Sequence, residues 1–383
     1  MIPITKPSIK KNDLNYLKKV LDSKILTDGY FQNKTEIIIK KLIKSNYIAL
    51  TQSCTAALEI SAILLNLQRN DEVIMPSYNF VSVANAIVLR GAKPVFVDID
   101  PKTLNISIKN LKNKITKRTK AIYIVHYGGN ACDMIELKKI AKKKKIFLIE
   151  DAAHAFTAKY QNKYLGTIGD IGVFSFHETK NLVGGQGGCI SINNKALIKR
   201  ANFILDKGTN RKQHINNLKN KIISYNKKNY YSWVDLGSEY RMPELSCALL
   251  YSQLLKLKQI QKKREIYWQK YKKIILRFKT DKFYIIEAIK YCKSAYHIFA
   301  LVFKNSNLSN IFKQEMQKQK ISATFHYVPL HKSKMGRKFC NYKLPITENI
   351  YDRIIRLPLF SDMTNKEFRK ISKVLEKFMK RYC

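Results

Sequence analysis

The stretch Phe174-Ser-Phe-His-Glu-Thr-Lys180-Asn181 runs directly into Leu182-Val-Gly184-Gly-Gln-Gly-Gly188. Its apolar start, Val173 to Phe176, is typical of a buried strand, and the polar turn after it presents one lysine. The glycines allow close backbone approach, or φ angles that other residues resist. A lysine in a turn is usually solvated surface. Lys180 gains weight from its position between a strand end and a glycine run, in a chain whose earlier half predicts an α/β sheet.

Length and composition indicate an ordinary globular protein. With 383 residues, 45% of them hydrophobic, the chain can form one large and one smaller domain. Its seven cysteines are scattered singly, without the spacing of metal or redox sites, which favours reduced thiols and predicts no metal. The first residues lack the pattern of a secretory signal, and no apolar run is long enough for a membrane span. We therefore expect a cytoplasmic protein without a membrane partner.

The formal net charge of +43 would ordinarily suggest a polyanionic partner. The lysines, however, lie throughout the chain among isoleucines and asparagines, and these three residues share A/T-rich codons. A mutational bias therefore explains the excess, and we expect no specific nucleic-acid partner, only weak non-specific binding at low salt. A regulatory or nucleic-acid-binding protein remains the alternative to an enzyme.

Short apolar runs alternate with helical segments through the first half of the chain. This alternation predicts a mostly parallel sheet covered on both faces. Residues 244–264 predict a long helix that leads into a smaller α+β domain, which gives domains of 1–250 and 251–383. The polar segment 206–232 predicts a loop. The expected strands are 47–51, 72–76, 94–98, 121–125, 146–149, 173–176 and 189–192, and the expected helices include 56–67, 80–89, 133–145 and 365–382.

Polar residues stand at several of the predicted strand ends. Ser53-Cys54-Thr55 begins a helix, where free N–H groups favour an anion, although an ordinary N-cap is the alternative. Asp151 ends a strand at the edge where open α/β sheets bind ligands, and a helix cap or surface acid is its alternative. Tyr78 lies at the same edge and could stack on a flat ring or pack in the core.

Together with Lys180, these features suit pyridoxal 5′-phosphate (PLP). A lysine amine forms a Schiff base with the PLP aldehyde. An acid keeps the pyridine nitrogen protonated, so that the ring can act as an electron sink. A helix N-terminus helps to neutralise the phosphate.

The chain also resembles a known family over nearly its whole length. It is similar to the DegT/DnrJ/EryC1/StrS sugar aminotransferases, which are PLP-dependent transferases of fold type I. The motifs that carry the resemblance are Ser53-Cys-Thr-Ala-Ala-Leu58, Asp71-Glu-Val-Ile-Met-Pro-Ser-Tyr78, Val125-His-Tyr127, Glu150-Asp-Ala-Ala153, His177-Glu-Thr-Lys-Asn181, Trp233-Val-Asp-Leu-Gly-Ser238 and Phe325-His-Tyr-Val-Pro-Leu-His331.

The resemblance implies a role for each matching residue. Lys180 would form the Schiff base and carry protons, and Asp151 would pair with the pyridinium nitrogen. Tyr78 would stack on the ring, and His154 would lie near the ring hydroxyl. The phosphate would be held by Ser53, Cys54, Thr55 and Ser175, and the sugar would be approached by His326, Tyr327 and His331, for which ordinary packing is the alternative.

The His177-Glu-Thr-Lys-Asn181 string is similar to a subgroup that transaminates dTDP-4-oxo-6-deoxy-D-glucose. It implies L-glutamate as amino donor, dTDP-4-amino-4,6-dideoxy-D-galactose as product and use in enterobacterial common antigen-type surface polysaccharide. It also implies a homodimer with shared active sites. Another nucleotide-linked keto-sugar is the alternative substrate. Two residues depart from the family pattern: Gln186, where Glu is common, and Glu239, where many relatives have Asn.

Overall fold

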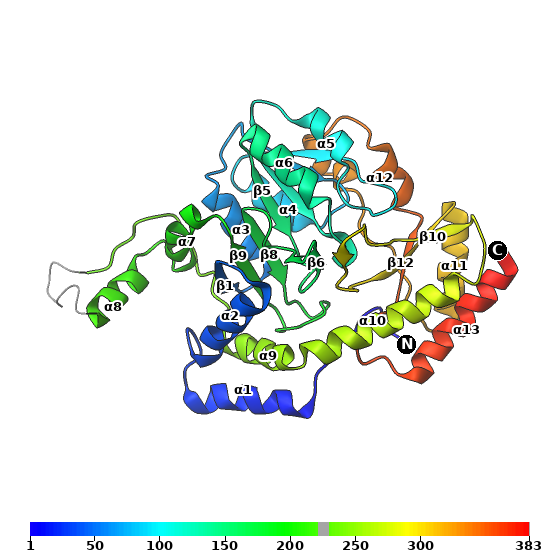
Figure 1. Cartoon of the computed structure of the whole chain (residues 1–383), viewed down its shortest axis with the longest axis horizontal. Coiled ribbons are helices and arrows are strands. Elements are labelled where there is room, and N and C mark those ends of the chain that lie inside the picture. The colour runs from blue at the N-terminus through cyan, green and yellow to red at the C-terminus, as the bar shows by residue number, and fades with distance from the viewer. Residues whose placement is uncertain (221–229, 383) are drawn as a thin grey trace.

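The computed structural model describes residues 1–220 and 230–382, and a seven-stranded sheet forms its centre (Figure 1). Strand β9 runs antiparallel to its neighbours β1 and β8, and every other neighbouring pair is parallel. The predicted, largely parallel α/β sheet is therefore confirmed. In spatial order the strands are β1 (Tyr47–Thr51), β9 (Gly188–Ile192), β8 (Ile171–Ser175), β5 (Phe147–Asp151), β4 (Thr119–Val125), β2 (Glu72–Pro76) and β3 (Lys93–Val97).

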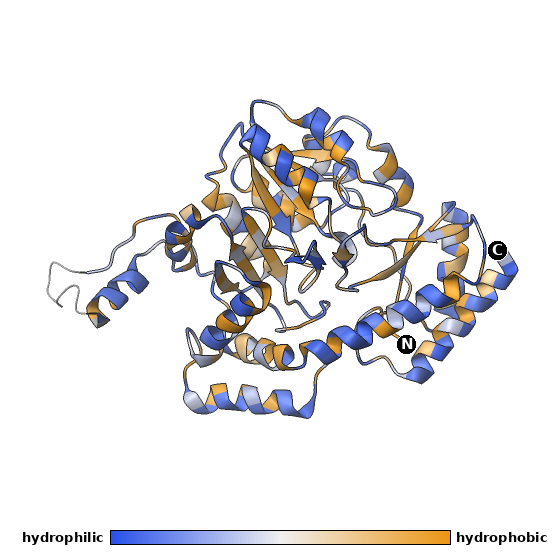
Figure 2. Ribbon diagram, in the orientation of Figure 1, coloured by the Kyte–Doolittle hydropathy of each residue, from blue (hydrophilic) through white to orange (hydrophobic). Residues whose placement is uncertain are grey.

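Helices cover both faces of this sheet, so its strands are apolar on both sides. Along β2, Val73 and Met75 join one buried cluster and Ile74 joins the other, as the two-residue period of a strand requires. Figure 2 shows hydrophobic residues concentrated along the central strands and hydrophilic ones on the outer helices. One face packs against α3 (Cys54–Leu64), α4 (Val81–Val88) and α7 (Ile198–Leu205), the other against α2 (Tyr30–Ile43), α6 (Met134–Lys144) and α9 (Glu244–Leu255).

A second, antiparallel sheet lies in the C-terminal part of the chain. Its strand order is β10 (Phe283–Ile285), β12 (Phe299–Phe303) and β13 (Ile354–Leu357). It packs with α10 (Leu257–Ile275), α11 (Ser306–Lys318) and α13 (Asn365–Tyr382) around a separate phenylalanine-rich core. The N-terminus also reaches this part, because Ile2 pairs with Ile321. The division of the chain at residue 250 stays a prediction.

The predicted helix over residues 244–264 is two helices. The chain leaves helical geometry at Lys256, between α9 and α10, and α10 continues to Ile275. The Lys256 ammonium lies 2.6 and 2.7 Å from the two carboxylate oxygens of Asp13 in α1 (Lys11–Ser23), which holds the break in place.

The loop predicted over 206–232 is wrong for residues 211–219, which form helix α8 (Arg211–Lys219). Its lysine, arginine, glutamine and leucine residues are good helix formers, and polar composition alone does not exclude a helix. Residues 221–229 of that prediction lie outside the described residues. Figure 1 shows α8 projecting from the body of the molecule.

The remaining elements are short. They are α5 (Ile108–Lys114), α12 (Pro345–Ile350) and a small sheet of β11 (Cys292–Lys293), β6 (Lys159–Tyr160) and β7 (Lys163–Tyr164). Across residues 1–220 and 230–382, no helix combines the length and the apolar character needed to cross a membrane.

Candidate active site

A cavity of about 520 Å³ opens where the carboxyl ends of the parallel strands face the C-terminal sheet. Side chains from both parts of the chain form its wall, including Ile298 and Arg356 from the C-terminal part. Most of the predicted site residues meet here, as expected for residues at neighbouring strand ends. The predicted residues that line the cavity are Ser53, Cys54, Thr55, Asp151, His154, Ser175, Lys180, His326 and Tyr327.

The start of α3 provides one end of the cavity. Ser53 is the N-cap, and its hydroxyl accepts a hydrogen bond from the Ala56 N–H at 3.0 Å. The first-turn N–H groups of Cys54 and Thr55 have no acceptor within a helix. Gly188 lies against this turn so closely that an added Cβ would stand 2.4 Å from Cys54 N. The result is an open, electropositive helix start that suits a phosphate.

Asp151 and Lys180 provide the two titratable groups of opposite sign. Burial raises the pKa of the Asp151 carboxyl, opposed by a hydrogen bond from the Ala153 N–H at 3.0 Å and by the charge of Lys180. Removal from bulk water lowers the pKa of the Lys180 amine, and the nearby carboxylate of Asp151 opposes this shift. Burial also raises the pKa of the Cys54 thiol well above its usual range, so it stays neutral beside the helix start. An amine with a lowered pKa is suited to nucleophilic and proton-transfer roles.

The turn that carries Lys180 is held by the next residue. The Asn181 amide donates to the Ala295 carbonyl at 2.8 Å and to Gln261 Oε1 at 3.2 Å, and it accepts from His297 Nδ1 at 2.8 Å. These bonds connect the turn to α10 and to the segment before β12. The lysine therefore projects from a fixed backbone.

Three imidazoles stack beside the lysine. The ring centroids of His154 and His297 lie 4.4 Å apart, and those of His154 and His326 lie 5.6 Å apart. Burial lowers the pKa of all three well below the usual value, so the rings are neutral. His154 Nδ1 accepts the Gly128 N–H at 3.4 Å, so its Nε2 carries the proton and donates to the Tyr327 hydroxyl at 3.3 Å. The Tyr327 O–H is then free to donate into the cavity.

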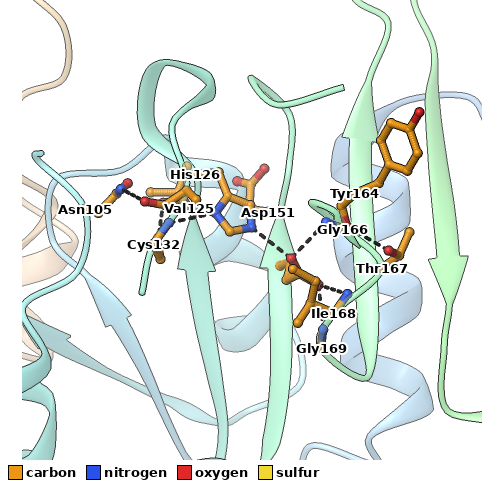
Figure 3. A network of polar contacts seen from close by, with 12 residues as sticks. Asn105, Val125, His126, Cys132, Asp151, Tyr164, Gly166, Thr167, Ile168 and Gly169 are labelled. Atoms are coloured by element: carbon orange, nitrogen blue, oxygen red, sulfur yellow. Dashed lines mark hydrogen bonds and ion pairs between the residues drawn. The ribbon is translucent and has the colours of Figure 1, made fainter. Parts of the chain in front are cut away.

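A buried network supports the end of β5 (Figure 3). His126 Nδ1 accepts the Cys132 N–H at 3.2 Å, so its Nε2 donates to the Glu150 carboxylate at 2.9 Å. The His126 N–H in turn donates to the Asp151 carbonyl at 3.0 Å. Glu150 also accepts the N–H groups of Gly166, Ile168 and Gly169, at 2.8, 2.7 and 2.6 Å. Because every polar atom of this network is satisfied, it fixes the backbone that presents Asp151.

Tyr78 does not occupy the position that the sequence predicted for it. Its side chain is fully buried, contacts the rings of Tyr127 and Tyr327, and does not line the cavity. It therefore presents no ring face to the cavity, and core packing, the alternative that the sequence left open, describes its position in this structure. Phe80, with 56% of its surface exposed, does line the cavity and is the aromatic face that the sequence interpretation missed.

His331 also lies outside the cavity wall. Its Nδ1 is 2.6 Å from the Ser77 hydroxyl, and its Nε2 is 3.1 Å from Glu348 Oε1. With both nitrogens engaged and the ring 5% exposed, His331 fastens the 325–331 segment to the end of β2. Its contact with substrate stays a prediction, and within one chain its ring does not line the cavity.

The structure also shows where the two residues lie that depart from the family pattern. Gln186 lines the cavity, and Glu239 forms an ion pair with Lys207 at the surface. Sequence reasoning did not assign His297 and Arg356, which complete the wall. For Arg356 a signal was present, because an arginine inside the apolar run Ile354–Leu357 is uncommon.

Comparison with known proteins places this geometry in a family. Residues 7–376 match the DegT/DnrJ/EryC1/StrS aminotransferase family. The chain belongs to this family. An uncharacterized protein of Methanocaldococcus jannaschii is 34% identical, with 99% of this chain and 97% of that protein covered. GDP-perosamine synthase of Escherichia coli O157:H7 is 30% identical, with 98% of each covered.

A solved structure agrees in fold. The PLP-form of the putative sugar aminotransferase Spr1654 from Streptococcus pneumoniae superposes with a TM-score of 0.89 at 22% identity, covering 99% of each chain. The protein is thus a PLP-dependent sugar aminotransferase with the expected fold.

The residues of the cavity fit PLP. Ser53, Cys54, Thr55 and Ser175 would hold the phosphate, Phe80 offers a ring face, and Asp151 is a buried carboxylate able to receive an N–H donor. When bound, PLP supplies the electrophile and electron sink of transamination. Within the described ranges, no group of three His, Cys, Asp or Glu side chains is arranged to bind a metal ion.

Proposed function

We propose that this sugar aminotransferase uses L-glutamate to aminate the C4 ketone of a nucleotide-linked 4-oxo-6-deoxy sugar. The observation that carries the proposal is the meeting of Lys180, Asp151 and the open start of α3 in one cavity. The motif His177-Glu-Thr-Lys-Asn181 supports dTDP-4-oxo-6-deoxy-D-glucose as the acceptor and dTDP-4-amino-4,6-dideoxy-D-galactose as the product.

In this proposal each residue of the cavity has its own role in the reaction. Lys180 Nζ accepts the proton from the donor's Cα, because its lowered pKa leaves it a competent base, and in the second half of the reaction it delivers a proton to C4 of the sugar. Asp151, with its carbonyl fixed by His126, holds a positively charged N–H near the strand end. The Tyr327 hydroxyl, which accepts from His154, donates to an acceptor of the sugar or amino acid. Because the stacked histidines are neutral, they place no further positive charge beside Lys180.

A GDP-linked keto-sugar is the second candidate acceptor. The 30% identity to GDP-perosamine synthase over the whole chain supports it. The two candidates differ in nucleotide base, and the cavity residues beside Lys180 would bind the reacting sugar in either case.

The test supplies purified, PLP-loaded protein with glutamate and either dTDP-4-oxo-6-deoxy-D-glucose or the GDP-linked counterpart. Mass spectrometry detects the amino sugar, and NMR at C4 gives its configuration. An axial amine from the dTDP substrate supports the dTDP-galacto product. Turnover of the GDP sugar alone would replace it with the second candidate, and no amino sugar from either would contradict both.

We also propose a homodimer with shared active sites. Helix α8 extends away from the body of the molecule (Figure 1). Residues 230–236 include several exposed apolar side chains. Trp233 is 78% exposed and Tyr230 is 61% exposed, which a second copy would cover. Light scattering of the purified protein measures the oligomeric state, and a monomer at micromolar concentration would contradict the proposal.

The amino sugar would enter a surface polysaccharide, and the predicted destination is one of the enterobacterial common antigen type. The cytoplasm is the compartment that we propose, because nucleotide-linked sugars are made there. Deleting the gene in its host and analysing the polysaccharide for the 4-amino sugar tests the destination. The alternative of a non-catalytic regulator is set aside by the membership in an aminotransferase family.

A further inference from the structure

One cation in the cavity wall has no assigned task. Arg356 lies on β13, where its N–H donates to the Thr324 carbonyl at 2.8 Å and Ala300 of β12 is its register partner. The side chain therefore projects from a rigid element into the cavity. Its backbone also anchors the segment that leads to His326 and Tyr327.

The guanidinium of Arg356 lacks the partner that such a group requires. Its Nε is buried, and no acceptor for it is found among residues 1–220 and 230–382. An arginine remains charged at any physiological pH, and its planar N–H fork matches the two oxygens of a carboxylate. A partly buried arginine at a cavity wall, with a buried Nε that has no partner in the described residues, therefore indicates an anionic ligand.

The rest of the wall favours the same kind of ligand. Asn79 is 2% exposed and lines the cavity, and its Nδ2 has no acceptor in the described part of the chain. Asp151 is the single carboxylate among the described lining residues, whereas Lys180 and Arg356 are both basic. Two unpaired donors and an excess of basic groups leave room for an acceptor-rich group.

We propose that Arg356 is the specificity-determining residue that binds a carboxylate of the amino donor. The inference rests on the proposed function, and it assigns the part of the site that binds the amino donor. In an α-amino acid the carboxylate carbon is bonded to the carbon that carries the amine. The carboxylate therefore stays near Lys180 when the amine reacts there.

The position of Arg356 agrees with this short separation. Its charge contributes to lowering the pKa of Lys180, and it acts similarly on His154 and His326. The diphosphate of a nucleotide sugar would lie on the far side of the hexose ring from C4. A diphosphate is therefore the less suitable anion for this guanidinium, although both anions would bind arginine well.

The test compares Arg356→Met with Arg369→Met, which removes the same charge from an exposed position on α13. The PLP-loaded proteins are titrated by calorimetry with glutarate, a dicarboxylate that cannot react, and separately with dTDP and GDP. We expect Arg356→Met to weaken glutarate binding roughly 10- to 100-fold and leave the nucleotide affinities unchanged. Arg369→Met should match the unaltered protein.

Kinetics gives a second readout. The apparent dissociation constant for glutamate should rise by a similar factor in Arg356→Met. It is obtained from the concentration dependence of the half-reaction, followed through the change in cofactor absorbance without sugar present. The glutamate affinity of Arg356→Lys should lie between those of Arg356→Met and the unaltered protein, because lysine keeps the charge and loses the planar pair of N–H donors. Arg356→Lys and the melting temperatures of all variants show whether a loss of affinity comes from misfolding.

Unchanged glutarate affinity in Arg356→Met overturns the proposal, and so does a loss confined to dTDP or GDP. Because glutarate binding needs no turnover, the result is independent of the acceptor sugar. A protein that binds glutarate through Arg356 but makes no amino sugar would contradict the proposed function and leave this subsite standing.

Discussion

Asn181 Oδ1 lies 2.8 Å from Nδ1 of His297, so the residue after Lys180 is joined to the C-terminal sheet's side of the cavity. An amide oxygen can only accept, so the His297 Nδ1 must carry the proton. A direct hydrogen bond therefore connects the turn that presents Lys180 to the stacked imidazoles. A disturbance of either is expected to reach the other.

Replacing Asn181 with Ala should lower turnover by roughly a hundredfold, because small displacements of a reacting group have effects of that size. It should also reduce the free energy of unfolding by about 1–3 kcal/mol, since His297 and Ala295 lose buried partners. Steady-state kinetics and urea denaturation measure the two effects. Asn181→Asp keeps the acceptor for His297 and should be milder, and equal defects in both variants would contradict the assignment.

Lys180→Ala should abolish the visible band of covalently bound cofactor and reduce turnover by at least about a hundredfold. Lys142, in the last turn of α6, provides a matched Lys→Ala control that should leave both properties unchanged. Absorbance and product analysis are the readouts. Retained turnover in Lys180→Ala would remove the lysine from its role.

Asp151→Asn should keep the cofactor bound but slow proton abstraction, because an amide cannot hold the ring nitrogen in its protonated form. The Ala153 N–H can still be accepted by the amide oxygen, so the strand end should remain intact. The half-reaction with glutamate in a stopped-flow instrument measures the rate. Near-normal rates would argue against a role for the Asp151 charge.

Phe80 and Tyr78 should respond in opposite ways to substitution by Ala. Phe80→Ala removes an exposed ring, so stability should change little, while cofactor affinity falls about five- to tenfold. Tyr78→Ala empties a fully buried site and should reduce the free energy of unfolding by about 3–5 kcal/mol. Thermal denaturation and cofactor titration of both variants test this, and the reverse pattern would restore the stacking role to Tyr78.

Gly188→Ala should weaken cofactor binding, because the new Cβ would lie 2.4 Å from Cys54 N and push the start of α3 outward. Gly187→Ala is the matched control. Its Cβ would meet the Cε of Met242, the flexible end of a side chain that can move aside. Equilibrium titration with PLP measures both variants. The prediction is contradicted if the two bind the cofactor equally well.

Acidification should destabilise the protein through His154, His297 and His326. Burial lowers their folded-state pKa below the unfolded value, so the unfolded chain binds more protons as the pH falls below about 6.5. Stability is complete above this pH, and each histidine then removes up to about 1.4 kcal/mol per pH unit. Urea denaturation between about pH 8 and pH 5.5 measures the slope, and His297→Gln should make it shallower. An unchanged slope in that variant would contradict the prediction.

The sequence predicted the central sheet well, because its strands are short apolar runs flanked by polar turns. It also brought Lys180, Asp151 and Ser53 together, since ends of parallel strands share one edge. It did not distinguish Tyr78 from Phe80, because a difference of two residues across a strand end decides whether a ring enters the core or the cavity. Arg356 and His297 do not lie at the ends of the parallel strands, because Arg356 is on β13 of the second sheet and His297 is in the segment before β12, so the reasoning from strand ends could not find them. The role of His331 depended on contacts with Ser77 and Glu348 that no local pattern reveals.

The pairing of Ile2 with Ile321 has a consequence for the order of folding. The Ile2 N–H donates to the Lys320 carbonyl at 2.8 Å, and its carbonyl accepts the Ser322 N–H at 2.9 Å. During synthesis, Ile2 leaves the ribosome more than 300 residues before Ile321 and can pair only after residues 320–322 have followed. The core around Phe299 and Phe312, which includes Ile2, can therefore close only late in translation. Until residues 320–322 have emerged, the backbone of Ile2 has no partner in that core.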